Sequence, residues 1–367
     1  MTKLREISWK DSSFIWIMLG LLTLLLRWLF SINPAFTEIL YSRGIFQVIR
    51  VLYDFTVGWI PIAFLYLLAP LLLFLGMRRL IKGIKTPMSI RKRLGKGVIN
   101  LLAFFSGVFF LFHFLWAFNY FRTPVEQQLG LTEIPSDTTF VVREFKRMSE
   151  EMMATRALIG DTSALSIDVL PPQLEDSMRS LLEEVLAEYS FPVIGRVRGR
   201  KLLPFGMLMR SGATGIYIPF AMEGHLDGGL TAPAVPSTMA HEMAHGYGFG
   251  DEGSCNFWAY LACERSSNPV IRYSGQFEYW IYVARQYRKL FPKQYAAYRK
   301  TLPKGILNDI ELIKTTYKKY PGFFPQTSAY VYDQYLKSQG IKEGSFSYSR
   351  VVQLVISWRE KYETADQ

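Results

Sequence analysis

A chain of 367 residues has room for one soluble domain of ordinary size plus a further part, and half of its residues are hydrophobic. That share is high for a soluble enzyme, so the composition argues against a wholly soluble protein. The net charge of +11 does not indicate nucleic-acid binding, because the basic residues are not interleaved with aromatic residues along one face.

The first membrane helix is predicted at about residues 14–30, an apolar run broken only by Thr23 and Arg27. No small-residue cleavage site follows near residues 31–34, so we expect a retained helix and not a signal peptide. A second run, residues 57–77, has about the length needed to cross a bilayer and is the second predicted span.

The third predicted span, residues 98–118, follows the densest basic run of the chain. Residues 78–96 contain eight cationic residues and no acidic one, and the positive-inside rule makes this loop cytoplasmic. With three spans, the N-terminus is then cytoplasmic and everything after Arg122 lies outside. His113 within the third span is interpreted as a histidine packed between helices, with a metal or proton site as the alternative.

The fold class predicted is α+β: a membrane domain at residues 1–121 and one mostly helical domain with a small sheet at residues 122–367. Ser136 and Asp137 can cap a helix that ends near residue 158. Short β-rich runs between residues 191 and 220 predict the sheet, and Pro219 suits an edge strand with which an extended substrate can pair. Further helices are predicted at residues 173–189, 277–291, 305–320, 329–338 and 348–358.

The sequence His-Glu-Met-Ala-His at residues 241–245 carries the strongest chemical signal. Histidines spaced by four lie on one face of a helix, so His241 and His245 can reach one metal ion while Glu242 leans over its open side. This HExxH pattern is that of zinc metallopeptidases. The alternative, two surface histidines spaced by four without function, leaves the residues that follow unexplained.

A third ligand is predicted just after this helix. Glycines within residues 246–250 predict a turn, and Asp251 is a plausible N-cap of a second helix. Glu252 opens that helix and is the predicted third ligand, because hydrolytic zinc sites take three protein ligands and keep one position for water. Asn256 lies one turn later on the same face and is predicted to accept the N–H of a ligand histidine.

Other candidate ligands are less favoured. Cys255 and Cys263 lie eight positions apart on the second helix, about 12 Å, which is too far for a disulfide. They are interpreted as buried small hydrophobic residues, with zinc ligation as the alternative. His225 and the acids beside it are interpreted as a loop on the rim of the cleft, because the ligand set after residue 240 is already complete.

Hydrolysis also needs a donor for the charge that develops on the tetrahedral intermediate. Tyr273, after the glutamate helix, and Tyr348, at the start of the last helix, are the two candidates. Tyr273 is the first choice because it is nearer in sequence to Glu252. For each, the alternative is a buried ring whose hydroxyl has a structural partner.

The metal stretch resembles the gluzincin clan of metallopeptidases, in which HExxH is completed by a glutamate on the following helix. The whole chain resembles a bacterial family with three membrane helices that is catalogued only as a domain of unknown function. Its members often carry a second acidic residue two positions after Glu252, where this chain has Ser254. The further motifs that match are WAFNYFR (116–122), NFWAYLAC (256–263), YDQYLK (332–337) and SYSRVVQL (347–354).

The resemblance and the motif together imply a membrane-anchored zinc peptidase. We expect His241, His245 and Glu252 to bind Zn²⁺ and Glu242 to act as the base, with a peptide or protein as substrate. In a gram-negative cell the enzyme would lie in the inner membrane with its catalytic domain in the periplasm. A non-catalytic, zinc-stabilised receptor or scaffold that binds peptides in the same cleft is the competing expectation. An intramembrane protease is disfavoured, because no apolar run of about 20 residues surrounds the motif, and nothing indicates an oligomeric state.

Overall fold

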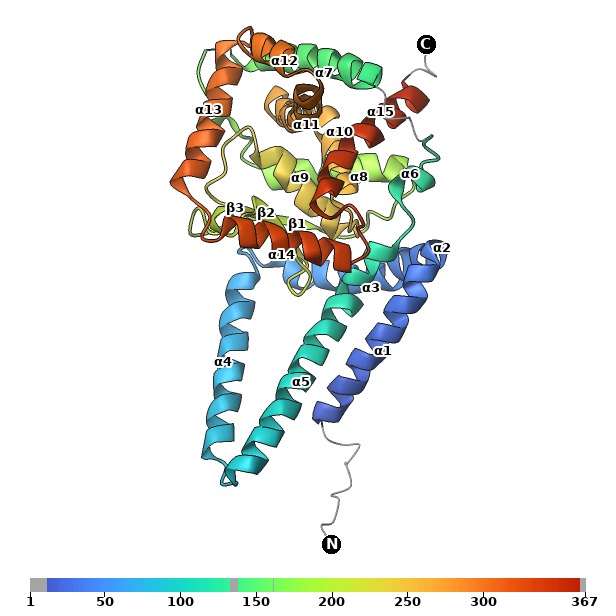
Figure 1. Cartoon of the computed structure of the whole chain (residues 1–367), viewed down its shortest axis with the longest axis vertical. Coiled ribbons are helices and arrows are strands. Elements are labelled where there is room, and N and C mark those ends of the chain that lie inside the picture. The colour runs from blue at the N-terminus through green and yellow to red at the C-terminus, as the bar shows by residue number, and fades with distance from the viewer. Residues whose placement is uncertain (1–11, 133–137, 161, 364–367) are drawn as a thin grey trace.

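The chain forms a stem of three long helices and a body that sits on one end of them (Figure 1). The computed structural model describes residues 12–132, 138–160 and 162–363. In the stem, α1 is Ser12–Ile32, α4 is Leu65–Lys85 and α5 is Ile90–Leu115. Between α1 and α4 the chain forms α2 (Pro34–Thr37), the π-helix η1 (Glu38–Ile45), α3 (Phe46–Asp54) and the 3₁₀ turn η2 (Val57–Trp59).

The body is mostly helical, as predicted, with one small sheet. Its helices are α6 (Val125–Gln128), α7 (Thr138–Ile159), α8 (Leu174–Glu188), α9 (Val235–Gly246), α10 (Glu252–Glu264), α11 (Pro269–Leu290), α12 (Pro292–Arg299), α13 (Lys304–Lys319), α14 (Pro325–Ser338) and α15 (Arg350–Tyr362). In the described part of the chain, short 3₁₀ segments also occur: η3 (Ala117–Phe121), η4 (Ile167–Val169), η5 (Met209–Ser211) and η6 (Gly344–Ser349).

In the stem, α1 and α5 pack side by side. Gly20 of α1 lies so close to Ser106 of α5 that a Cβ on the glycine would be 2.7 Å from the serine Cβ, the close approach that small residues permit between membrane helices. His113 is buried between the two helices, with Nε2 3.1 Å from Arg27 Nη1 and Nδ1 3.0 Å from the Phe109 carbonyl oxygen. The predicted packed histidine is confirmed.

Among the described residues, two helices are long and apolar enough to cross a membrane, and they are α1 and α5. They correspond to the first and third predicted spans. The prediction of three such helices is therefore supported for two. The third long helix of the stem, α4, is apolar only as far as Met77, because its second half carries Arg78, Arg79, Lys82 and Lys85.

The second predicted span was also wrong in its position. Residues 57–77 were expected to be helical, but the helix begins at Leu65. The chain is extended at Ile60, where the following residue, Pro61, disfavours helical backbone. None of the residues of α4 is buried, so it stands apart from α1 and α5 (Figure 1).

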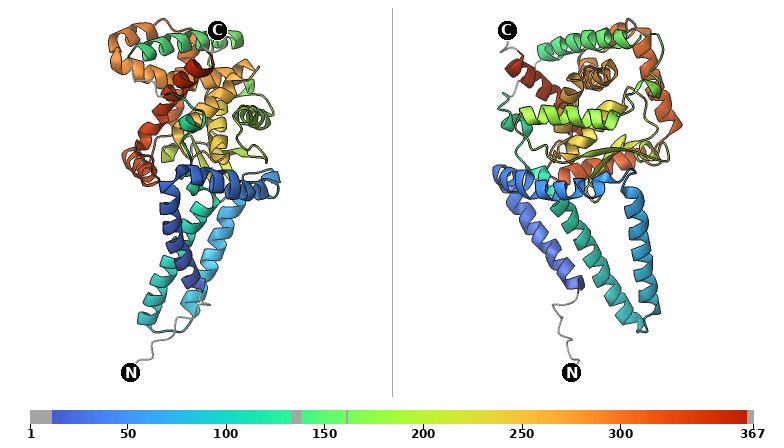
Figure 2. Two further views of the ribbon diagram at one scale, coloured as in Figure 1. Left: turned by 90° about the vertical axis from the view of Figure 1, so that its right-hand side faces the viewer. Right: turned by 180° about the vertical axis from the view of Figure 1, so that it is seen from behind.

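Residues 34–59, which we call the collar, lie across the end of the stem where it meets the body (Figure 2). The usual polarity is reversed along α3: Val48 and Leu52 are exposed, whereas Arg50 is buried. The Arg50 guanidinium lies 4.9 Å from the centroid of the Tyr247 ring, just after α9. The collar therefore supports the body with its polar face and presents an apolar face outward, which is typical of a helix in a membrane interface.

The sheet has the order β1-β3-β2. β1 (Arg198–Leu202) is parallel and β2 (Gly215–Ile218) antiparallel to the central strand β3 (Glu223–Asp227). An edge strand that includes Pro219 was predicted; β2 is an edge strand, but it ends at Ile218, just before the proline. The prediction of a rim loop around His225 was wrong, because His225 is the fully buried middle residue of β3.

The core of the body lies among α7, α8, α9, α10, α11 and α15. The helices predicted at residues 173–189 and 305–320 are confirmed by α8 and α13. The helix predicted at residues 277–291 is the second part of α11, which begins at Pro269. The proposed caps of α7, Ser136 and Asp137, lie outside the described residues.

Candidate metal centre

The two helices that carry the candidate ligands, α9 and α10, are joined by a glycine turn. Gly248 has a φ of +90°, and a Cβ there would lie 2.8 Å from the Phe46 ring of the collar, so both conformation and space require glycine. The next helix begins after Asp251, whose Oδ2 accepts the Ser254 N–H at 2.9 Å. The predicted turn and N-cap are confirmed.

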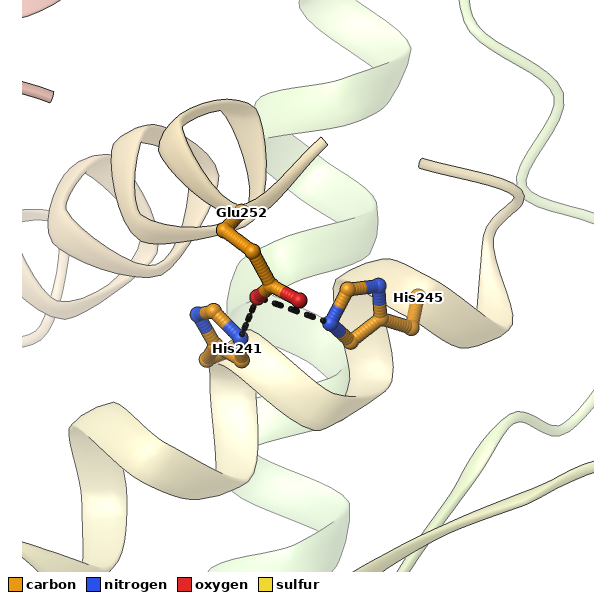
Figure 3. Close-up of side chains that lie close together, drawn as sticks. All are labelled: His241, His245 and Glu252. Atoms are coloured by element: carbon orange, nitrogen blue, oxygen red, sulfur yellow. Dashed lines mark hydrogen bonds and ion pairs between the residues drawn. The ribbon is translucent and has the colours of Figure 1, made fainter. Parts of the chain in front are cut away.

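His241, His245 and Glu252 meet between these two helices (Figure 3). One ligand atom of each residue lies within 4.8 Å of the others. Glu252 Oε2 is 3.0 Å from His241 Nε2 and 3.4 Å from His245 Nε2. All three residues are buried, and the group could hold a metal ion.

The second nitrogen of each imidazole ring is held by an oxygen acceptor. His241 Nδ1 lies 2.7 Å from Asn256 Oδ1, and His245 Nδ1 lies 2.8 Å from the Phe249 carbonyl oxygen. When each Nδ1–H donates a hydrogen bond to its acceptor, the neutral ring presents an unprotonated Nε2 toward Glu252. Asn256 thus makes the contact that the sequence predicted for it.

Glu242 is buried on the side of α9 that faces the sheet. A Cβ on Gly215 of β2 would lie 2.3 Å from Glu242 Oε1, and a Cβ on Gly224 of β3 would lie 2.6 Å from Glu242 Cβ. Oε2 of Glu242 is buried and has no hydrogen-bond partner among the described residues. The two glycines therefore make room for a carboxylate that retains an unused oxygen.

The pKa values of the two glutamates of the site are shifted in opposite directions. Burial raises the pKa of Glu242. Burial also acts on Glu252, but the neighbouring His245 and His241 outweigh it and hold the pKa of that carboxyl below its usual range. Opposite shifts of two carboxyl groups in one site are typical of groups with different chemical roles.

Two tyrosines from the last part of the chain border the site. The Tyr332 hydroxyl, on α14, donates to Glu252 Oε1 at 2.5 Å, and it lies 3.2 Å from the Tyr348 hydroxyl on η6. The Tyr348 ring is stacked on the His241 ring at 6.1 Å between centroids and 5° between planes. Tyr348 was among the predicted residues. Tyr332 was missed, although it opens the YDQYLK motif, which was the available signal.

The structure does not bring Tyr273 to the site. Tyr273 is fully buried in the first turns of α11, and its hydroxyl donates to Asp309 Oδ2 at 2.9 Å. Asp309 is also paired with Arg156 at 2.8 Å. Tyr273 was predicted to be the donor because it follows the glutamate helix closely, but α11 already begins at Pro269 and directs the ring into the core.

Cys255 lies behind His245. Its Sγ is 3.3 Å from His245 Nδ1, the nitrogen that does not face Glu252. Burial raises the pKa of the Cys255 thiol to about 12. Both Cys255 and Cys263 are free and buried, as the sequence predicted.

The site is joined directly to the end of the stem. The Trp116 indole N–H, immediately after α5, donates to the His245 carbonyl oxygen at 2.8 Å. Arg122 donates to the Gly248 carbonyl oxygen at 2.8 Å and pairs with Glu38 of the collar at 2.6 Å. The WAFNYFR segment therefore fixes the ligand helix to the stem.

The sequence matches one protein family over most of its length. The match covers residues 41–356, from the collar to α15, and the family is described as "Protein of unknown function (DUF3810)". No curated protein and no solved structure matches the chain. The matched range includes α4, α5, both ligand helices and the two tyrosines that border them, and the chain belongs to the DUF3810 family.

Proposed function

We propose that this protein is a membrane-anchored, zinc-dependent peptidase of the gluzincin type. The proposal is supported by one observation above all: the ligand atoms of His241, His245 and Glu252 converge beside Glu242, a buried carboxylate with an unused oxygen among the described residues. Two histidines and a glutamate form a known ligand set of hydrolytic zinc sites, and a free carboxylate next to them is the usual base.

The residues fit zinc by their chemistry. Imidazole nitrogens and a carboxylate oxygen are ligands that zinc takes, and both rings are oriented through Nδ1 by oxygen acceptors, as is usual for zinc-bound histidines. Bound there, zinc would supply a Lewis acid that polarises a peptide carbonyl and activates water.

The residues of the chain then have separate tasks. Glu242 takes the proton of the attacking water and passes it to the leaving amine. Tyr348, stacked on His241, donates to the oxygen of the polarised carbonyl. The free edge of β2, which begins at Gly215 beside Glu242, pairs with the extended backbone of the peptide.

The competing function is a zinc-stabilised receptor that binds peptides in the same cleft without cutting them. Structural zinc sites are usually closed by four protein ligands, and the group among the described residues has three. A receptor that does not cut peptides also needs no general base, which is the role proposed for Glu242. Both points favour the peptidase.

The variant Glu242→Gln tests the proposal. The amide cannot take a proton, so we expect hydrolysis to fall by about 10²- to 10⁴-fold with an unchanged zinc content. Metal analysis and the digestion of an unstructured peptide mixture measure the two quantities, with the exposed Glu311→Gln as the matched control. Purified protein without zinc, or a Glu242→Gln protein of full activity, contradicts the proposal.

We further propose three membrane crossings with the body outside the cytoplasm. Both α1 and α5 enter the body at their C-terminal ends (Figure 1). Two crossings in the same direction require a return crossing between them, and α4 is the long helix available for it. The hairpin between α4 and α5 carries the basic run of residues 78–96, which the positive-inside rule places in the cytoplasm.

Reporter fusions test this topology. A reporter enzyme that is active only outside the cytoplasm is expected to work when it is fused after Arg122 or at the C-terminus, and to fail within residues 78–96. The reverse pattern contradicts the proposed orientation and leaves the metal site untouched.

A further inference from the structure

α14 lies across the proposed metal site and has contacts near its start, in its middle and at its end. Near its start, the Phe323 N–H donates to the Arg210 carbonyl oxygen at 3.0 Å, close to the chain that leads into β2. In its middle, Tyr332 contacts Glu252. At its end, the Tyr335 and Tyr120 hydroxyls lie 3.0 Å apart, next to the exit of α5.

The helix buries little of its surface. Leu336 is its one buried residue, and its main neighbour is η6, the 3₁₀ segment that carries Tyr348. Few buried contacts allow a segment to open at low cost while the rest of the structure stays folded. α14 is therefore the part of the site that can move aside for a substrate, and we call it the lid.

The lid lies at the level where the stem meets the body. Figures 1 and 2 show α14 at the height of the collar, and the centroid of its Tyr335 ring lies 6.4 Å from that of the Phe112 ring near the end of α5. The site is thus covered from the direction of the stem. Toward the sheet it is closed by β2 and β3, which contact Glu242.

Several large apolar side chains are exposed around the lid. Phe323 and Phe324 precede α14 and are 68% and 72% exposed, and Val331 and Phe346 are also largely exposed. The collar presents a similar apolar face at the same height. Aromatic and aliphatic side chains at the level where membrane helices end are typical of a surface that lies in the bilayer interface.

We propose that the substrates of this site are polypeptides anchored in the same membrane, which enter at the bilayer surface as the lid moves aside. The proposal rests on the peptidase function put forward above. A chain that leaves the bilayer beside the stem passes the lid within its first residues, whereas a soluble chain meets a face covered by lipid. Tethering also raises the local concentration of the chain at the site.

Digestion in proteoliposomes tests the proposal. The zinc-loaded, full-length protein is given one randomised, unstructured segment of about 60 residues in two forms, free and attached to a single membrane helix. We expect the anchored form to be cut at least about tenfold faster, with cleavage sites within about 15 residues of the anchor, the reach of a short extended chain. Mass spectrometry gives the rates and positions.

A second measurement does not depend on activity. A bimane label on Phe324→Cys is expected to be quenched by brominated lipids, and the same label on Ile167→Cys, on η4 between α7 and α8, is not. Both native cysteines are buried, so the label is specific. In the digestion, Phe323→Ser with Phe324→Ser is expected to slow cleavage of the anchored form, and Ile167→Ser with Val169→Ser to leave it unchanged.

The outcomes separate the two proposals. Equal rates for the free and anchored forms, or a label at position 324 that lipids do not quench, overturn the membrane-anchored substrate and leave the peptidase standing. If wild type and Glu242→Gln both cut neither form, the peptidase function itself fails, and the substrate proposal fails with it.

Discussion

The proposed metal site is formed by two regions of opposite character. On one side, all but one of the twelve residues of α9 and eleven of the thirteen residues of α10 are buried, including every candidate ligand. On the other side, α14 has fourteen residues and one of them is buried. The difference teaches that the candidate ligands are held by dense packing while the helix over them buries little, a division that suits a site needing both fixed geometry and access.

The first prediction concerns the opening of the two regions. Amide hydrogens of α14 are expected to exchange more than about 10³-fold faster than those of α9, because opening the lid breaks few buried contacts whereas opening α9 requires global unfolding. Hydrogen exchange with mass spectrometry measures both in one sample. Similar protection of the two helices would remove the distinction between a rigid half and a mobile half.

The second prediction concerns the tyrosines. Tyr348→Phe is expected to lower turnover by about 10²- to 10³-fold, the loss usual for one donor to the developing oxyanion, with zinc content unchanged. Tyr273→Phe is expected to keep full turnover but to be less stable. It leaves Asp309 without one buried partner, which lowers the free energy of unfolding by about 1–3 kcal/mol. Peptide digestion and thermal unfolding distinguish the two variants. Normal turnover of Tyr348→Phe means that the donor lies elsewhere, with Tyr332 the next residue to change.

The third prediction concerns the orientation of one ligand. Asn256→Ala is expected to weaken zinc binding by about 10- to 100-fold, because the ring of His241 loses the acceptor on Nδ1. Competition with a metal chelator measures the affinity. Asn308→Ala, on α13, changes an exposed asparagine that donates to the Thr162 carbonyl oxygen and is the matched control. An affinity equal to wild type would show that packing alone fixes the ring.

The sequence predicted the rigid half of the site better than the mobile half. Spacing within one helix and a cap at the next were sufficient to find His241, His245, Glu252 and Asn256, because these contacts are set by local geometry. Tyr332 reaches Glu252 from 80 positions away in the chain. No periodicity encodes such a contact, so Tyr332 was missed and Tyr273, closer in sequence, was preferred.

The same limit explains the errors in the fold. The collar has an exposed apolar face and a buried arginine, Arg50, so its pattern is the reverse of that of a soluble helix. Hydropathy alone also extended the second span over residues 57–77, although Pro61 keeps the chain out of a helix until Leu65. The sequence analysis made no prediction for the collar and began the second span too early. Both regions lie where stem, collar and body meet, and there the surroundings of a side chain are not those that its sequence pattern assumes.

The last and smallest predicted effect lies at the far end of α10, within the rigid half. Glu264 ends this helix with Oε1 buried and unpartnered among the described residues. Burial, reinforced by Glu151, raises the pKa of Glu264 to about 7, against the opposing effect of Arg359. A carboxyl whose pKa is higher in the folded state than in the unfolded state favours folding most below pH 4.5, and that contribution is lost as the pH rises toward 7.

Glu264→Gln removes this ionisation. We therefore expect the variant to be more stable than wild type by about 1–2 kcal/mol at pH 8, with a difference that shrinks as the pH falls toward 4.5. Thermal unfolding in detergent across this range measures the effect, and the exposed Glu311→Gln is the control. Because Glu264 belongs to the densely packed α10, the rate of amide hydrogen exchange in α14 is expected not to change. If the variant stabilises α10 and also slows amide hydrogen exchange in the lid, the two halves of the site open together.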